Sequence, residues 1–158
     1  MPRAARTHCG SRSASGLVAR RPPLATARGS PTVRGVTADE ISNVAEALFR
    51  AFERNDTDAI LGCCEPDARF FQNGRGGSTV TELLPGFATM SERIGHHRYS
   101  EVRRETFEGG FVEEHRVTST LPDGSPMDAS VCVVGRIGPS GKLVELREYA
   151  DLGRRSPT

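Results

Sequence analysis

The sequence of 158 residues contains no run of about 18 or more apolar residues, so it offers no segment that could cross a membrane as a helix. Acidic residues are absent from its beginning. The first 37 residues contain seven arginines and no Asp or Glu, whereas residues 38–158 carry a net charge of −6. This mildly acidic body lacks the basic face that broad nucleic-acid binding requires. We therefore expect neither a membrane nor a nucleic acid as a partner.

The four cysteines form no CxxC pair and no spaced Cys/His set. Cys63 and Cys64 are adjacent, which disfavours a disulfide between them. We expect no metal and no cofactor, and reduced thiols fit a cytoplasmic location. Cys132 lies among valines and is expected to be an inert core thiol. His96 and His97 would point to opposite faces of a strand, which favours a role at a strand entry over metal binding.

The Arg-rich segment 1–36 is also rich in Ser, Gly, Pro and Ala and has few large apolar residues. It cannot bury enough surface to offset the entropy cost of ordering, so we expect a disordered tail. An organellar targeting peptide, or a start codon assigned too far upstream, remains an alternative. The expected domain covers residues 37–153, and residues 154–158 form a short C-terminal tail.

Two helix starts are marked by capping residues. Thr37 and Glu40 form a capping box ahead of "ISNVAEALFRAF", whose apolar residues recur at helical spacing. This helix should end near Arg54. Asp56 is the expected N-cap of a short second helix that reaches Cys63.

The rest of the chain predicts one further helical region and five strands. "DARFFQN" has the pattern of a strand, "GRGG" that of a loop, and "TVTELLPGFATMSERIG" that of a helix bent or broken at Pro85–Gly86. After Gly95 the period changes to two, which predicts four strands separated by "EGG", "PDGSP" and "GPSG". Such short links make neighbouring strands antiparallel. The predicted fold class is α+β, with helices covering one side of the sheet.

The last strand, "KLVELREYA", carries an acidic residue on an apolar face. Alternation places Val144, Leu146, Glu148 and Ala150 on the same side. Glu148 is therefore a candidate pocket carboxylate, although a buried carboxylate with a purely structural partner would give the same pattern.

Four motifs carry a resemblance to a known fold: "FERNDTDAI", "DARFFQN", "LPDGSP" and "GKLVELREYAD". Over about residues 38–153 the chain resembles the nuclear-transport-factor-2-like fold and, within it, the SnoaL-like group. Polyketide cyclases, ketosteroid isomerase and limonene-1,2-epoxide hydrolase belong there. The resemblance implies a cone-shaped α+β barrel, in which a curved sheet wraps around a pocket that the helices close, often in a homodimer. It does not name a reaction, because this fold hosts many functions.

The isomerase pattern is not met, because its tyrosine falls on Leu48, its basic aspartate on Gln72 or Asn73, and its protonated aspartate on Val133. The epoxide-hydrolase pattern fits better. Its Tyr-Gln-Asn falls on "FQN", its Arg-x-Asp on "EHR" with the order exchanged, and its second aspartate on Glu148. Two carboxyl groups in an apolar pocket can act as acid and base because their pKa values are driven apart.

Strand "FVEEHRVTSTL" has two possible registers. The length of the following hairpin favours Glu114 and Arg116 pointing into the pocket, beside Glu148. A slip of one residue would instead bring Glu113 and His115 inward and leave Glu114 and Arg116 to pair in solvent.

We therefore expect a protein that binds a small, mostly apolar molecule and that carries out acid/base chemistry of the hydrolase, cyclase or isomerase kind. A non-catalytic binding or dimerisation module of the same fold is the alternative. The expected catalytic residues are Glu148, Arg116 and Glu114, and the expected ligand-binding residues are Phe71, Asn73, His115, Val131 and Val133.

Overall fold

A computed structural model describes residues 35–151. The predicted tails lie outside this range, except for the last two residues of the first. The helices are α1 (Ala38–Glu53), α2 (Thr57–Cys63), α3 (Val80–Ala88) and α4 (Met90–Ile94). Within the described range, every helix is too short or too polar to cross a membrane.

The predicted helix caps are confirmed. The hydroxyl of Thr37 accepts the Glu40 backbone N–H, and the Glu40 carboxylate accepts the Thr37 backbone N–H at 2.8 Å. The second cap is Asp56, whose Oδ1 accepts the Ala59 N–H at 3.0 Å. Each cap satisfies amide groups that the first turn of a helix leaves without partners. Both helices therefore begin where the sequence predicts.

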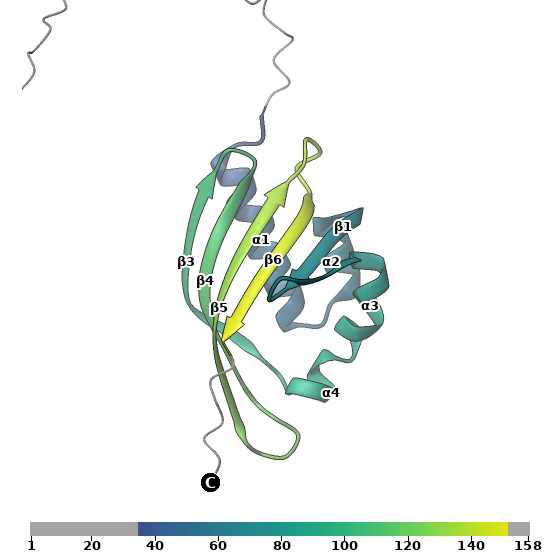
Figure 1. The fold of residues 1–158 in the computed structure, drawn as a ribbon, viewed down its shortest axis with the longest axis vertical. Helices are drawn as coiled ribbons and strands as arrows, with labels where there is room; N and C mark the ends of the chain where they lie inside the picture. Colours follow the sequence, from purple (N-terminus) through teal and green to yellow (C-terminus); the bar gives the residue numbers. More distant parts are fainter. Residues whose placement is uncertain (1–34, 152–158) are drawn as a thin grey trace, which may run out of the picture. The chain divides into compact units, whose positions relative to one another are not determined.

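Six strands form one sheet in the described part of the chain, in the order β2-β1-β6-β5-β4-β3 (Figure 1). The outer strands do not meet, so the sheet stays open. The β1–β6 pair is parallel, and the other pairs are antiparallel. The strands are β1 (Cys64–Gln72), β2 (Arg75–Thr79), β3 (Arg98–Phe107), β4 (Gly110–Thr120), β5 (Pro126–Ile137) and β6 (Leu143–Asp151).

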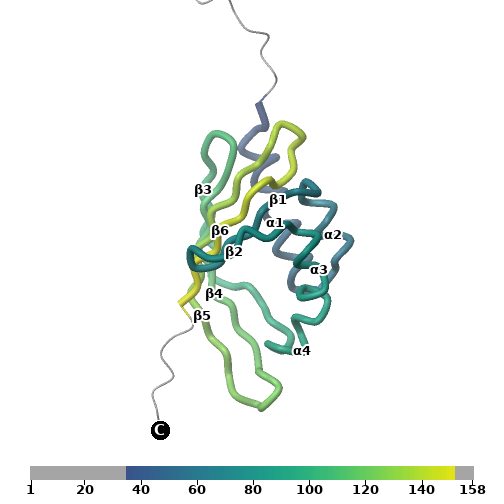
Figure 2. The backbone as a smooth tube through the Cα atoms, turned by 45° about the vertical axis from the view of Figure 1, so that its right-hand side comes forward, coloured from purple at the N-terminus to yellow at the C-terminus, as the bar shows by residue number. Residues whose placement is uncertain are grey.

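The helices gather on one side of the sheet, which we call the covered face; the other side is the open face (Figure 2). The apolar stripe of α1 packs onto the covered face. Its buried residues include Ile41, Leu48, Phe49 and Phe52. The predicted α+β class, with helices over a curved sheet, is thus confirmed.

Two local predictions need correction. "GRGG" was expected to be a loop, but Arg75–Thr79 pairs with β1 as an edge strand. Gly76 and Gly77 adopt φ angles of 101° and 98°, and at Gly76 a Cβ would lie 3.1 Å from the Phe70 carbonyl oxygen. Glycine permits this close strand pairing because it lacks a Cβ. The helical region breaks at Thr89 rather than at Pro85, which lies within α3.

Candidate functional site

One row of paired residues crosses the covered face and brings distant polar side chains together. Arg104 pairs with Glu113, Glu113 with Val133, Val133 with Glu148, and Glu148 with Gln72. Directly opposed residues on neighbouring strands point to the same side of a sheet. The row therefore places Glu113 on one side of Val133 and Glu148 on the other, and Val133 itself is wholly buried.

Glu113 is fully buried yet has two partners. Its Oε2 accepts a hydrogen bond from Arg104 Nε at 2.6 Å, and its Oε1 lies 2.8 Å from His115 Nδ1. Arg104 Nη1 also donates to both oxygens of Ser42 on α1, each at 3.0 Å. A buried charge is tolerated only when it is paired and hydrogen-bonded in this way. The network ties β3 and β4 to α1.

His115 lies on the covered face with one ring nitrogen held and the other not. Its Nδ1 faces Glu113, while Nε2 makes no hydrogen bond within residues 35–151. The ring packs at centroid distances of 4.9 Å from Phe49 and 4.7 Å from Tyr99. A carboxylate at Nδ1 favours the tautomer with its proton there, so Nε2 is left as an acceptor.

Tyr99 lies against His115 and close to three carboxylates. Burial raises the pKa of its phenol, and the negative charges of Glu148, Glu53 and Glu113 raise it further. The phenol therefore keeps its proton at neutral pH and can donate a hydrogen bond. Its backbone N–H, at the free edge of β3, donates to Glu53 Oε1 at 2.8 Å.

His97 precedes β3 and is only 2% exposed. Neither of its ring nitrogens makes a hydrogen bond of good geometry within the described range, although the Gly95 backbone lies near the ring. Burial lowers its pKa, and the opposing effects of the Glu53 charge and the Gly95 backbone are smaller. The imidazole is therefore neutral. His96, by contrast, is exposed, so the two histidines diverge as predicted.

Glu148 lies where the alternation of β6 predicts, on the covered face beside Leu146 and Ala150. Its Oε1 accepts a hydrogen bond from Gln72 Nε2 at 2.8 Å, and the side chain is half-buried. Val144 does not share this face. A register shift between β5 and β6 makes Leu143 the buried residue there, and Val144 is 36% exposed.

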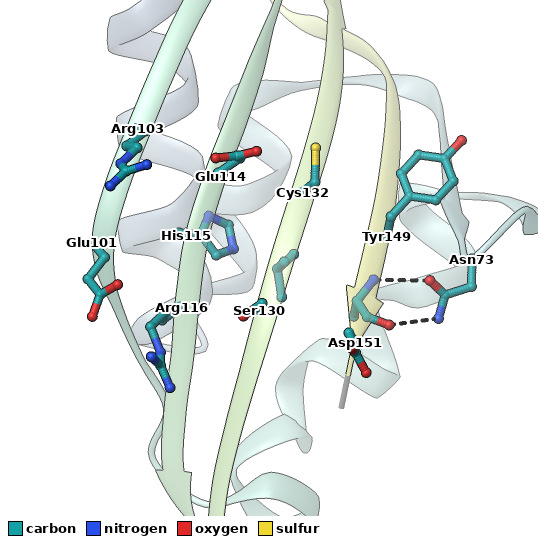
Figure 3. Close-up of a pocket in the computed structure, with 12 residues that line it drawn as sticks. Asn73, Glu101, Arg103, Glu114, His115, Arg116, Ser130, Cys132, Tyr149 and Asp151 are labelled. Atoms are coloured by element: carbon teal, nitrogen blue, oxygen red, sulfur yellow. Dashed lines mark hydrogen bonds between the residues drawn. The ribbon is translucent and has the colours of Figure 1, made fainter. Parts of the chain in front are cut away.

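The predicted grouping of Glu148 with Glu114 and Arg116 is wrong. Both side chains lie on the open face (Figure 3). There Arg116 forms an ion pair with Asp128 instead. The alternative register is the observed one because it buries Phe111 completely and gives the inward glutamate, Glu113, an arginine partner. The opposite register would expose Phe111 and bury Glu114 and Arg116.

The residues expected to bind ligand divide between the two faces. Val131, Val133 and His115 are buried on the covered face. Phe71 is on the open face, with the Arg147 guanidinium 4.3 Å from its ring centre. Asn73 exchanges hydrogen bonds with the backbone of Ala150, at 3.0 and 3.4 Å, and so fixes the end of β1 to β6 (Figure 3).

The open face holds a shallow depression of about 540 Å³. Glu101, Arg103, Glu114, Arg116, Cys132 and Tyr149 are among the residues that line it (Figure 3). Cys132 is thus not the core thiol that was expected. Most of the residues that line the depression are polar or charged, which does not match the mostly apolar ligand predicted.

Tyr99 and Arg104 were missed because the strand they share is irregular. They are five residues apart, so simple alternation would put them on opposite faces. However, Glu101 has a positive φ of 54°, and the pairing of β3 with β4 shifts between Ser100 and Arg103. This bulge returns Arg104 to the covered face. The sequence gives no glycine or proline signal for it.

The arrangement of sheet and helices is shared with solved structures. A nuclear-transport-factor-2-like protein from Burkholderia xenovorans matches with a TM-score of 0.64 at 17% identity, over 75% of this chain and 94% of that one. An LEH-like epoxide hydrolase from M. tuberculosis matches with a TM-score of 0.62 at 17% identity, over 72% and 84%. The chain has the nuclear-transport-factor-2-like fold.

A third structure, from Jannaschia and named as a SnoaL-like polyketide cyclase, matches with a TM-score of 0.64 at 16% identity, over 80% of this chain and 92% of that one. No family sequence model and no curated protein sequence matches the chain. Identities this low show the fold alone. Any function of this chain has to be argued from its own side chains.

Proposed function

We propose that the covered face binds a small, mostly apolar molecule and catalyses acid/base chemistry on it without a cofactor. The observation that carries this proposal is the row across the sheet, which sets Glu148 and Glu113 on either side of Val133. The negative charges of both carboxylates act on Tyr99 and raise its pKa. Buried valines and phenylalanines supply apolar contact, and a few polar groups supply orientation.

The polar groups divide into acceptors and a donor. Glu148 is held by the neutral amide of Gln72, and His115 has Nε2 free. Either can accept a proton from a bound molecule. Tyr99 keeps its proton, because burial and the neighbouring carboxylates raise its pKa, so it can donate to an oxygen on which negative charge develops. This combination suits proton abstraction next to a carbonyl, ring closure, or epoxide opening.

The test is a ligand screen by thermal shift, followed by a turnover assay for each compound that binds. Glu148→Gln should leave the melting temperature of the free protein nearly unchanged and lower turnover by at least about 100-fold. The matched control is Glu145→Gln, on the same strand, where the side chain pairs with Arg147. If Glu148→Gln turns every binding compound over at the parental rate, the catalytic proposal is rejected.

The alternative, a non-catalytic dimerisation module, is favoured by the open face. Tyr149 is 47% exposed there, and Val112, Cys132 and Val134 are partly exposed beside charges of both signs. A two-fold interface between such faces could pair Arg103 with the partner's Glu114 twice. Light scattering of the parent and of Tyr149→Arg tests this homodimer. A parent that remains monomeric at about 100 μM would exclude it as the functional state.

A further inference from the structure

We propose that His97, Tyr99 and His115 together bind an uncharged oxygen substituent, a hydroxyl or a carbonyl, on the ligand. The proposal rests on the proposed function, since it concerns a molecule bound at the covered face. It adds the chemical class: an oxygenated apolar molecule, rather than a hydrocarbon, a carboxylate or an amine. We call these three residues the oxygen anchor.

The three side chains form one continuous group. The rings of His97 and Tyr99 are 5.4 Å apart between centroids, and those of Tyr99 and His115 are 4.7 Å apart. Both contacts are edge-to-face, with interplanar angles of 86° and 67°. Phe49 of α1 closes the group from the helix side at 5.2 Å from Tyr99. The anchor is therefore held by packing rather than by hydrogen bonds among its members.

Each member has unused hydrogen-bonding capacity. Within residues 35–151, the two His97 ring nitrogens are buried and make no hydrogen bond of good geometry, although the Gly95 backbone lies near the ring. The hydrogen bonds of Tyr99 and His115 in this range use the Tyr99 backbone N–H and His115 Nδ1, not the hydroxyl or Nε2. Buried polar groups are nearly always paired, so the two His97 nitrogens mark a place where a bound molecule or water completes the hydrogen bonding. A neutral imidazole and a phenol each donate and accept. A hydroxyl, which does the same, matches them best.

The surrounding charge excludes an anionic ligand. The negative charges of Glu148, Glu53 and Glu113 act on Tyr99 and raise its pKa. Among the described residues, the cation on this face is Arg104, and Glu113 and Ser42 already occupy it. A carboxylate or phosphate on the ligand would meet repulsion without a compensating partner. An ammonium group would be attracted, but it donates only, so it would leave the donors of the anchor unsatisfied.

The test compares four probes of similar size on the full chain: cyclohexanol, methylcyclohexane, cyclohexanecarboxylate and cyclohexylamine. Affinities come from ligand-observed NMR titrations. Histidine ring ¹⁵N shifts report contact with His97 and His115. Cyclohexanol should bind at least about five-fold more tightly than methylcyclohexane, the amount expected for one or two net hydrogen bonds. It should also bind more tightly than the two charged probes and shift both rings.

Tyr99→Phe removes the hydroxyl and keeps the ring. It should lower cyclohexanol affinity by roughly five-fold and leave methylcyclohexane affinity unchanged. Tyr149→Phe, which removes the corresponding hydroxyl from the open face, is the matched control and should change neither.

The outcomes separate the two proposals. If methylcyclohexane binds as tightly as cyclohexanol, or if cyclohexanol leaves both histidine rings unshifted, the anchor is rejected while the apolar site stands. Unchanged ¹⁵N shifts would mean that ordered water alone makes the missing hydrogen bonds to the two histidine rings. Tighter binding of cyclohexylamine or the carboxylate also rejects the anchor. If no probe binds at millimolar concentration, the proposed function itself fails.

Discussion

Glu113 and His115, two residues apart on β4, share a hydrogen bond of 2.8 Å on the covered face of the sheet. Their nearest neighbours on the same strand, Glu114 and Arg116, face the other way. Each of these two pairs consists of a glutamate and a basic residue, yet the two pairs occupy opposite environments. The first pair lies beneath α1 and the second lies at the solvent, so a substitution in the first pair has a control one residue away in the second.

Glu113→Gln should lower the free energy of unfolding by about 3 to 5 kcal/mol, the cost of leaving a buried partner charge uncompensated. The charge in question is that of Arg104, whose side chain is 14% exposed. Urea denaturation measures the change. Glu114→Gln, at the exposed neighbour, should change the same quantity by no more than about 0.5 kcal/mol. Equal effects of the two substitutions would contradict the observed register.

The stability of the protein should fall with acidification partly because of His97. Its pKa in the folded protein lies below its ordinary value of 6.5, so below that pH the unfolded chain binds the proton more strongly than the folded one. The free energy of unfolding should therefore decrease as the pH falls from about 6.5, by about 1.4 kcal/mol for each unit by which the pKa is lowered.

The measurement is urea denaturation between pH 7.5 and 5, in steps of about 0.5. His97→Gln should flatten the curve in this window, whereas His96→Gln, at the exposed neighbour, should reproduce the parent. The nearby charges of Glu53 and His96 act in opposite directions on the His97 pKa. Identical pH dependence in parent and His97→Gln would show that His97 is not held neutral by burial.

Gly95→Ala should destabilise the protein more than Gly124→Ala. Both glycines have positive φ, 71° and 83°, so both substitutions introduce backbone strain. At Gly95, however, a Cβ would also overlap the Thr120 carbonyl oxygen, whereas at Gly124 it would meet open space. The overlap should add about 1 to 3 kcal/mol to the loss of stability. Thermal denaturation of both variants checks this difference, and similar melting temperatures would refute the close packing of the α4–β3 loop on β4.

Cys64 should resist thiol reagents in the folded protein, because burial raises its pKa to about 12 and leaves almost no thiolate at pH 8. Cys132, half-buried on the open face, should react readily. Mass spectrometry after labelling of a Cys9→Ser, Cys63→Ser background separates the two rates. Faster labelling of Cys64 than of Cys132 would contradict the assignment of the two faces.

Local signals in the sequence predicted the helices well because their causes are local. The capping box at Thr37 and the cap at Asp56 each act within three residues. The turns between β3, β4, β5 and β6 are of the same kind. The inward position of Glu148 also followed from alternation alone, because β6 is regular around it.

The composition of the site could not be predicted, because it depends on two features that leave no local signal. The bulge at Glu101 brings Arg104 onto the face that Tyr99 shares. The register of β4 is decided by which residue finds a buried partner: Glu113 finds Arg104, nine positions earlier on a different strand. Such choices depend on tertiary packing, which overrides the alternation of polar and apolar residues.

The position of β6 in the sheet constrains the order in which the strands can pair during synthesis. It lies between β1 and β5, although it is the last described strand in the chain. Until β6 has left the ribosome, β1 and β2 have no sheet to join, and their backbone groups have no partners on that side. The nascent protein must therefore keep an incomplete edge unpaired until β6 has been synthesised, and Glu148 belongs to the strand that completes the sheet. Truncation ahead of Leu143 would accordingly yield an aggregation-prone fragment rather than a smaller folded domain.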